Sequence, residues 1–362
     1  MKIAYVLCYR DPNYLRTITL TRALASIDGV ELLIVKNKRR GPLRYVETPL
    51  RLVLLRLRHR PAISVVGFRG HEIFWALYPL LARSRIVFDE FVNLHCWLVD
   101  ERKVVGSSSP LTRLIDWYVR WVLRRSAVVL EDTDAQADYS AHVYAAPRDK
   151  YAVVPVGADE RIFYQRPQLP RTDGRFEVLF FGTMLPLHGM DILLGAIELL
   201  KTTSRIEGIH FTLIGGRGNR RVLDAIGTFV RDHKLDEDVT YISWVPYHEL
   251  PERIATADLC IGGPLGDTPQ ARRVVTGKTY QFLAMGKATL VGETEARTEF
   301  IDRDNCLLVP QRSYQAVADA IVWAASHREE TKEIGSRGRA YYERAFAEPK
   351  IAEAAAAALG LA

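Results

Sequence analysis

Short runs of apolar residues alternate with longer amphipathic stretches along almost the whole chain. In the first half the apolar runs cover residues 3–8, 30–36, 63–68, 85–90, 127–131 and 151–156. Helical patterns lie between them, for example at residues 15–26 and 111–125. Continuous apolar strands separated by helices are typical of a parallel sheet covered on both faces. The first half therefore predicts an α/β domain.

The same alternation starts again after a polar, proline-rich segment at residues 165–174. The later apolar runs are residues 176–181, 210–214, 239–244, 259–263, 288–292 and 306–309. A chain of 362 residues also exceeds the size at which one core usually keeps growing. We expect two doubly wound α/β domains, 1–164 and 175–345, joined by a linker, 165–174, and followed by a helical tail, 346–362, able to pack back on the first domain. Ligands of such sheets bind beyond the C-terminal strand ends, so a cleft between the domains is the expected site.

Charge is distributed unevenly along this ordinary globular composition. Residues 1–150 hold 24 Lys and Arg against 15 Asp and Glu, while the whole chain carries a net charge of +6. The densest basic part runs from Lys36 to Arg60, with nine cations and the single acid Glu47. This asymmetry indicates that the first half meets something anionic.

Part of that basic segment, residues 50–60, has the pattern of an amphipathic helix. Leu50, Val53, Leu54 and Leu57 fall on one face, with Arg51 and Arg58 opposite. One interpretation is docking on an anionic membrane surface. The other is an ordinary crossover helix packed on the sheet, and the sequence leaves both open.

The location is expected to be cytoplasmic, or peripheral at the inner face of the membrane. The N-terminal apolar run reaches Arg10 too soon for a signal peptide, and no stretch approaches the ~20 apolar residues of a spanning helix. The four cysteines are scattered without CxxC spacing, as buried free thiols of a reducing compartment would be.

Five segments, most of them in the second half, follow one another in a characteristic order: VVPVGAD at 153–159 with Phe163 after it, FGTMLPLHGMD at 181–191, LIGGRG at 213–218, ADLCIG at 257–262 and KTYQFLAMGKA at 278–288. Together they resemble glycosyltransferase family 4, a group of retaining GT-B enzymes. In the first half, GFRGHE at 67–72 and FDEF at 88–91 look like one bacterial branch of the family. The resemblance implies the GT-B fold, with two Rossmann-like domains and an interdomain cleft. It also implies transfer of a sugar from a nucleotide sugar, UDP- or GDP-linked, to a hydroxyl of a glycan, lipid-linked saccharide or small glycoside, with retention and without a metal.

The sequence departs from the family where the donor phosphates bind. The family has an Arg after the first glycine of the donor domain and a Lys before the next glycine; here Thr183 and His188 follow Gly182 in those places. Two family glutamates, separated by seven residues, correspond to Arg273 and Gln281. Gln281 can still bind a ribose hydroxyl, but Arg273 cannot replace a carboxylate.

Substitutes for the missing cations are expected near residue 277. Arg273 and Lys278 are the candidates for direct phosphate contact, although both could be solvated surface charges. Thr276 and Gly277 precede a helix whose free N–H groups can cradle phosphate, and Asp267 is the candidate for the lost sugar contact. Gly215, Gly216 and Gly218 follow a strand, where they either let the backbone approach the ligand or form a plain tight turn.

On the acceptor side the residues after the strands of the first half are the candidates. The family resemblance places a catalytic residue at the end of the fourth strand, where Asp89 and Glu90 stand with His95 nearby. These acids are either catalytic or structural, paired with Arg69 or Arg102. The further acceptor-side candidates are Tyr14, Arg16, Arg69 and His71, of which His71 has a structural alternative.

Other functions explain less of the sequence. Residues 276–279 look like the end of a P-loop, but the pattern requires glycine where Arg272 stands. Asp132-Thr133-Asp134 mimics a metal-binding DxD, yet two complete α/β domains argue against that class. No aromatic-interleaved basic motif indicates nucleic acid as a partner. The remaining alternative is a catalytically weak or inactive GT-B binding subunit.

Overall fold

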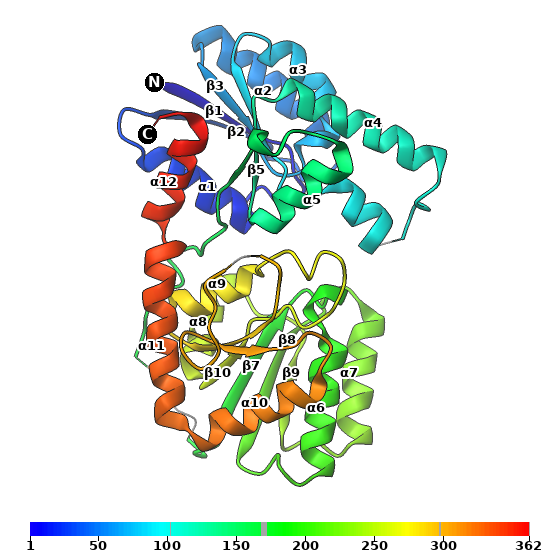
Figure 1. Ribbon diagram of the computed structural model, residues 1–362, viewed down its shortest axis with the longest axis vertical. Helices are drawn as coiled ribbons and strands as arrows, with labels where there is room; N and C mark the ends of the chain where they lie inside the picture. Colours follow the sequence, from blue (N-terminus) through cyan, green and yellow to red (C-terminus); the bar gives the residue numbers. More distant parts are fainter. Residues whose placement is uncertain (102, 168–171, 297, 362) are drawn as a thin grey trace. The chain divides into compact units, whose positions relative to one another are not determined.

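The computed structural model describes residues 1–101, 103–167, 172–296 and 298–361, which form two compact units. Unit 1 comprises Met1–Gly157 with Glu348–Ala362, and unit 2 comprises Ala158–Ala347 (Figure 1). The segment expected as a linker, residues 165–174, belongs to unit 2, and its residues 168–171 lie outside the described ones. The C-terminal segment returns to unit 1.

Unit 1 is built on a parallel sheet with six strands among its described residues, in the order β2-β1-β3-β4-β5-β6. The strands are β1 (Lys2–Leu7), β2 (Glu31–Lys36), β3 (Ile63–Val66), β4 (Arg85–Asp89), β5 (Val128–Glu131) and β6 (Tyr151–Val153). The helices are α1 (Leu15–Ser26), α2 (Arg44–Arg58), α3 (Phe74–Leu81), α4 (Pro110–Arg125), α5 (Asp134–Tyr144) and α12 (Glu348–Leu359). Short helical turns occur at Gly70–Glu72, Cys96–Glu101 and Arg148–Lys150.

Helices cover both faces of this sheet. One core joins β-strand side chains to α1 and α12, so that Ile351, Ala355 and Leu359 of the tail pack with Ile3 and Leu20. The other core joins the sheet to α2, α3, α4 and α5. A guanidinium nitrogen of Arg85 also donates to the carbonyl of Leu359 at 2.6 Å. The C-terminal helix is thus a structural part of unit 1.

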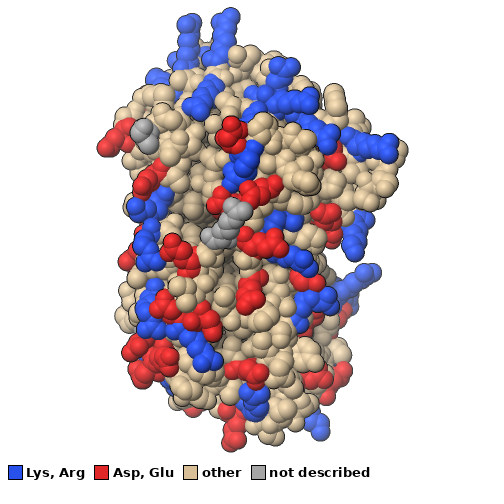
Figure 2. Space-filling view, in the orientation of Figure 1, with Lys and Arg blue, Asp and Glu red and all other residues tan. Residues whose placement is uncertain are grey.

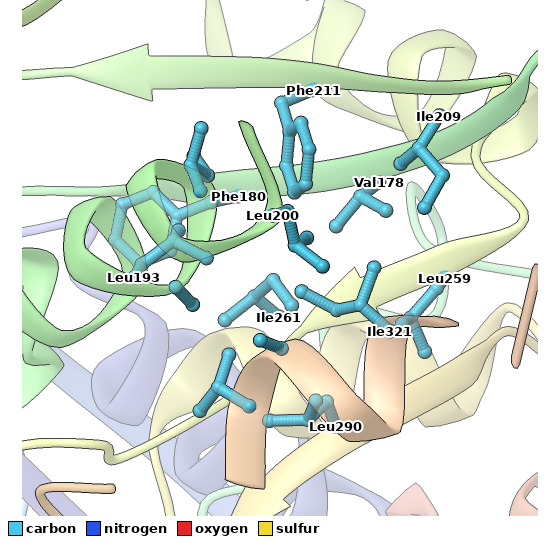
Figure 3. Close-up of a cluster of buried hydrophobic side chains, with 14 of the residues drawn as sticks. Val178, Phe180, Leu193, Leu200, Ile209, Phe211, Leu259, Ile261, Leu290 and Ile321 are labelled. Carbon is cyan, nitrogen blue, oxygen red and sulfur yellow. The ribbon is translucent and has the colours of Figure 1, made fainter. Parts of the chain in front are cut away.

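Unit 2 repeats this architecture, with the strand order β12-β11-β10-β7-β8-β9 in its described parallel sheet. The strands are β7 (Phe176–Gly182), β8 (Ile209–Gly215), β9 (Val239–Ile242), β10 (Leu259–Ile261), β11 (Ala288–Gly292) and β12 (Leu307–Val309). The helices are α6 (Met190–Thr202), α7 (Arg220–Asp232), α8 (Leu250–Thr256), α9 (Gly277–Ala284), α10 (Tyr314–Ser326) and α11 (Arg328–Ala345), with short turns at Pro186–His188 and Tyr247–Glu249. Figure 3 shows its core, where Phe180 and Phe211 of the sheet meet Leu193, Leu200 and Ile321 of the helices.

The predicted fold class is confirmed: both units are doubly wound parallel sheets. Each predicted apolar run contains a strand, but several strands are shorter than the runs. Residues 151–156 form a strand only to Val153, because Pro155 has no N–H for a sheet ladder. All four cysteines are buried and free, as expected. Among the described residues no helix is both long and apolar enough to cross a bilayer.

Candidate functional site

The carboxyl ends of β7 and β10 form the switch point of the sheet in unit 2, where chain connections diverge to the two sides. Doubly wound sheets bind ligands at this point. Two loops cover it, residues 183–189 after β7 and residues 262–276 after β10. The loops pack without space between them, since a Cβ at Gly189 would lie 2.6 Å from the backbone nitrogen of Gly266. The site therefore has a fixed backbone frame.

Two polar side chains, Lys278 and His188, lie at this switch point. Nζ of Lys278 sits 3.7 Å from the ring centroid of Phe180, whose ring is 6.2 Å from that of His188. Neither Lys278 Nζ nor His188 Nδ1 has a partner among the described residues, although both atoms are buried. Burial lowers the pKa of both groups well below their usual ranges, and the nearby Lys278 lowers the pKa of His188 further. Because unpaired buried groups cost free energy, this pair marks a place that an anion would complete.

Helix α9 begins beside this amine. Its N-cap residue is Thr276, whose hydroxyl donates to the carbonyl of Gly262 at 2.7 Å, and no side chain caps the helix. A helix N-terminus has free N–H groups and the positive end of the helix dipole, which together favour anions. The structure thus brings the predicted phosphate-cradling residues Thr276, Gly277 and Lys278 together with His188.

The predicted glycine turn has a steric explanation at one position. A Cβ at Gly215 would lie 1.9 Å from the carbonyl oxygen of Gly182, and the φ of Gly215 is +141°. Gly216 and Gly218 also have positive φ, but a Cβ at Gly218 would meet open space. Gly215 therefore lets two strand ends approach, and the turn itself requires the other two glycines.

The other donor-side candidates differ in how tightly they are held. Asp267 pairs with Arg312 at 3.0 Å, with both side chains largely exposed. Gln281 is buried and donates from Nε2 to the hydroxyl of Tyr247 at 3.0 Å. Arg273 is half-buried in a turn before α9, and Thr183 is exposed after β7. Asp267 and Gln281 are thus already engaged within unit 2.

In unit 1 the predicted catalytic Asp89 forms an ion pair with Arg16. Nη2 of Arg16 lies 2.9 Å from Oδ1 of Asp89, and both side chains are fully buried. Burial raises the pKa of Asp89, and the Arg16 charge opposes that shift. Arg16 Nη1 also donates to the carbonyl of Pro155 at 3.0 Å. Arg16, predicted on the acceptor side, therefore connects α1 to the end of β4 and to the chain that follows β6.

This pairing corrects the sequence interpretation, which names Arg69 or Arg102 as the structural partner of the acids. Arg69 instead contacts Glu72, with 2.5 Å between Nη2 and Oε1, and its Cζ lies 4.3 Å from the ring centroid of Trp97. Arg102 lies outside the described residues. The partner of Asp89 comes from α1, because the first helix of a doubly wound sheet begins at the same edge where β4 ends.

Glu90 belongs to a cluster of buried carboxyl groups at the ends of β4 and β5. Its oxygens accept from Ser140 at 2.6 Å and Asn93 at 3.2 Å. Burial raises the pKa of Glu90 and of Asp132 to about 7, and that of Glu131 well above its usual range, further raised by Glu90. The cluster therefore holds protons at neutral pH. Sequence reasoning missed Glu131, although its place at the end of a buried strand is a usable signal.

The remaining acceptor-side candidates differ in how far their side chains are buried. His95 Nδ1 lies 2.8 Å from Oδ1 of Asp116. His71 is buried, desolvation lowers its pKa to about 4, and its Nε2 has no hydrogen-bond partner among the described residues. Tyr14 is 37% exposed and stacks on Phe68, with ring centroids 5.1 Å apart. Of these candidates Tyr14 is the one most available to a ligand.

The DxD-like sequence at 132–134 is a helix start. Thr133 is the N-cap of α5 and accepts from the backbone nitrogen of Gln136 at 3.2 Å. Asp134 pairs with Arg148 at 2.6 Å. In the described parts of both units, no group of three or more His, Cys, Asp or Glu side chains is arranged to hold a metal ion.

Comparisons with known proteins place this geometry in a structural class. Residues 175–327 match the model of the family described as "Glycosyl transferases group 1". HepE from Anabaena, crystallised with UDP and glucose, superposes with a TM-score of 0.72 at 15% identity, over 99% of each chain. Sucrose-phosphate synthase from Thermosynechococcus elongatus gives 0.74 at 16% identity, over 99% of this chain and 98% of that one. A search of curated protein sequences gives no match.

The chain has the GT-B fold. A third structure, TarM, gives a TM-score of 0.63 at 14% identity over 85% of this chain and 57% of that chain. The family match covers most of unit 2, which is the unit that contains Lys278, His188 and the N-terminus of α9. At these identities the solved structures establish the fold alone.

Proposed function

We propose that the protein is a glycosyltransferase that takes a sugar from a nucleotide-diphosphate sugar bound to unit 2. The family match over residues 175–327 and the GT-B neighbours support sugar transfer from a nucleotide sugar. The acceptor is proposed to be a hydroxyl group of a glycan, lipid-linked saccharide or small glycoside, bound to unit 1. Retention of anomeric configuration and independence from metal are part of the proposal.

The observation that carries this proposal is the buried, unpartnered amine of Lys278 at the uncapped start of α9. When the sugar leaves, the bond between its anomeric carbon and the β-phosphate oxygen breaks, and negative charge grows on that oxygen. A protonated Lys278 and the first N–H groups of α9 would stabilise that charge. His188 lies at the same point and can add a donor once the anion restores its proton.

The donor base is proposed to be uridine or guanosine. The HepE structures contain UDP, UDP with glucose, or UDP-glucose, which favours uridine as the first to test. The protein is proposed to act in the cytoplasm or at the inner face of the membrane.

The test is a calorimetric titration of the protein with UDP, GDP and ADP, followed by measurement of UDP release from UDP-sugars. We expect Lys278→Met to weaken binding of the preferred diphosphate by about 10- to 150-fold, because one charge-assisted hydrogen bond contributes ~1.5–3 kcal/mol. Arg273→Gln is expected to weaken binding as well. The neighbouring exposed Arg272→Gln is the matched control and should leave affinity unchanged.

Binding of no nucleotide by the wild-type protein would refute the proposal. The metal-independent part fails separately if chelation by EDTA abolishes sugar transfer.

A second candidate function is a GT-B binding subunit with weak or no catalysis. It is favoured by Arg273 and Gln281, which stand where the resembling family has two glutamates. Nucleotide binding at normal affinity, without UDP release over long incubation with candidate acceptors, would select this alternative.

A further inference from the structure

Helix α2 presents an apolar stripe to solvent. Its N-cap Leu43 and four further apolar residues follow one another at intervals of three and four, which places them on one face. They are Leu43, Val46, Leu50, Leu54 and Leu57, all exposed, with Leu50 at 60% and Leu57 at 78%. The helix packs on its sheet through the opposite face, where Thr48 and Leu52 are buried. Of the predicted face of Leu50, Val53, Leu54 and Leu57, the three leucines are exposed and point away from the sheet, whereas Val53 is half-buried.

Exposed apolar side chains also occur on the neighbouring helices α3 and α4. Helices α2, α3 and α4 share one core on the same side of the sheet, and Trp121 of α4 packs against Phe74 and Tyr78 of α3. Their outward side chains include Trp75, 66% exposed, and Trp117, 63% exposed. Leu111 and Leu114 precede Trp117 at the same spacing. We call the exposed apolar residues of α2, α3 and α4 the α2–α4 face; its residues are Leu43, Val46, Leu50, Leu54, Leu57, Trp75, Leu111, Leu114 and Trp117.

Arginines surround this apolar face. Figure 2 shows Lys and Arg side chains over the upper part of unit 1 with few acids among them. Several exposed arginines on or next to these helices have no ion pair within the described chain, among them Arg39, Arg40, Arg58, Arg60, Arg83 and Arg113. The acids Glu47 and Glu72 are neutralised by Arg51 at 2.8 Å and by Arg69 at 2.5 Å. The face thus carries unbalanced positive charge.

A shallow groove between α2 and α3 combines both properties. Its lining residues include Val53, Leu57, Pro79 and Leu80 together with Arg56 and Arg83. Nη1 of Arg56 is buried and has no hydrogen-bond partner among the described residues. Apolar walls with two guanidinium groups match a phospholipid, which has an acyl chain below an anionic phosphate.

We propose that the α2–α4 face docks on an anionic phospholipid bilayer. Exposed leucines enter the interface, arginines contact lipid phosphates, and Trp75 and Trp117 occupy the headgroup level that indole rings prefer. Several exposed leucines and tryptophans on neighbouring helices favour a partner surface, and the exposed unpaired arginines near them select an anionic one. This inference rests on the proposed function in one respect. If the protein is a glycosyltransferase, docking on a bilayer implies that its acceptor is lipid-linked and is reached at the membrane surface.

The test is co-sedimentation of the full chain with vesicles of phosphatidylcholine alone or of phosphatidylcholine with phosphatidylglycerol. We expect binding to the anionic vesicles, weakened as salt is raised, and a blue shift of tryptophan emission on binding. The double variant Leu50→Gln, Leu57→Gln should lower the partition coefficient by at least about tenfold, since both side chains lose apolar burial in the interface. Arg58→Gln should lower it by up to about fivefold.

Ile301→Gln, an equally exposed apolar residue of unit 2, is the matched control and should bind vesicles like the wild type. Two results would overturn the inference: no binding to anionic vesicles at low salt, or binding that Leu50→Gln, Leu57→Gln leaves unchanged. The vesicle assay contains no nucleotide, so its failure is distinct from failure of the proposed function. Nucleotide affinity of the double variant should equal that of the wild type.

Discussion

Replacing Lys278 by methionine should stabilise the ligand-free protein while it weakens nucleotide binding. Lys278 is 5% exposed and its Nζ has no hydrogen-bond partner among the described residues. A buried, unsatisfied polar group costs ~1–3 kcal/mol. Methionine has a similar length and no strong polar atom, and its sulfur can keep the contact with Phe180, which contributes ~0.3–1.5 kcal/mol. We expect a gain of about 1–3 kcal/mol in the free energy of unfolding.

Lys287 provides a matched contrast within the same unit. It is 7% exposed, but its Nζ donates to the carbonyls of Ala255 at 2.8 Å and Ala257 at 2.9 Å. Lys287→Met loses both bonds and should destabilise the protein by about 1–3 kcal/mol. The same substitution at two similarly buried lysines is therefore expected to change the free energy of unfolding in opposite directions.

The assay is urea unfolding, with calorimetry to follow the melting of unit 2. For a unit of this size 1 kcal/mol corresponds to about 2–4 °C, so Lys278→Met should raise the melting temperature by about 2–12 °C. Loss of stability in Lys278→Met as large as in Lys287→Met would refute the reasoning, because it would show that the amine is satisfied in the native state.

The pH dependence of stability independently checks whether Lys278→Met stabilises the protein. Burial lowers the folded-state pKa of Lys278, so between that value and the unfolded value near 10.5 the unfolded chain binds one more proton. The stability of the wild type should therefore rise with pH across this window. The difference in unfolding free energy between Lys278→Met and wild type should shrink as the pH approaches 10.5 and stay small above it, where the lysine is neutral in both the folded and the unfolded chain.

Three further predictions concern both units. Asp89→Asn leaves Arg16 as an unpaired buried charge and should cost about 3–5 kcal/mol in urea unfolding. Because the pKa values of Glu90 and Glu131 are raised, the native state binds more protons than the unfolded chain. The free energy of unfolding should therefore fall as pH rises from ~5 to ~8, and Glu131→Gln should make this fall with pH less steep. Diphosphate binding should take up protons at Lys278 and His188, seen as binding enthalpies that differ between buffers of different ionisation enthalpy, and Lys278→Met should reduce this difference.

The alternation of apolar runs was sufficient to predict both sheets, because a strand buried on two faces needs apolar residues at every position. Strand ends were less predictable. Residues after Val66, for example, stay apolar, but Gly67 and Phe68 leave the sheet toward a helical turn at Gly70. An apolar run indicates that residues are buried, but not that they are paired in a sheet. Because the loops at the carboxyl edge of the sheet are also buried, the runs extend beyond the strands.

The site was predictable in its location and less so in its contacts. The position of Lys278 beside a helix N-terminus follows from local sequence, since Thr276 and Gly277 are typical of a helix start. That Arg16 pairs with Asp89 does not, because the two are joined by the packing of α1 on the sheet. For α2 the pattern indicated an apolar face, but both faces carry leucines, and tertiary packing buried Leu52 rather than Leu54.

Three features of the protein cost free energy in a folded domain, and each can be relieved in a different way. The carboxyl groups of Glu90 and Glu131 have raised pKa values, so protons from water suffice and no ligand is required. The amine of Lys278 cannot be relieved so simply, because it lies at a helix N-terminus that already favours negative charge; an anion satisfies both at once. The leucines of α2 need apolar cover, and the surrounding arginines require that cover to be anionic. The proposed nucleotide diphosphate in unit 2 and the proposed phospholipid surface on unit 1 would relieve these two costs, and both are expected of an enzyme that glycosylates a lipid-linked acceptor.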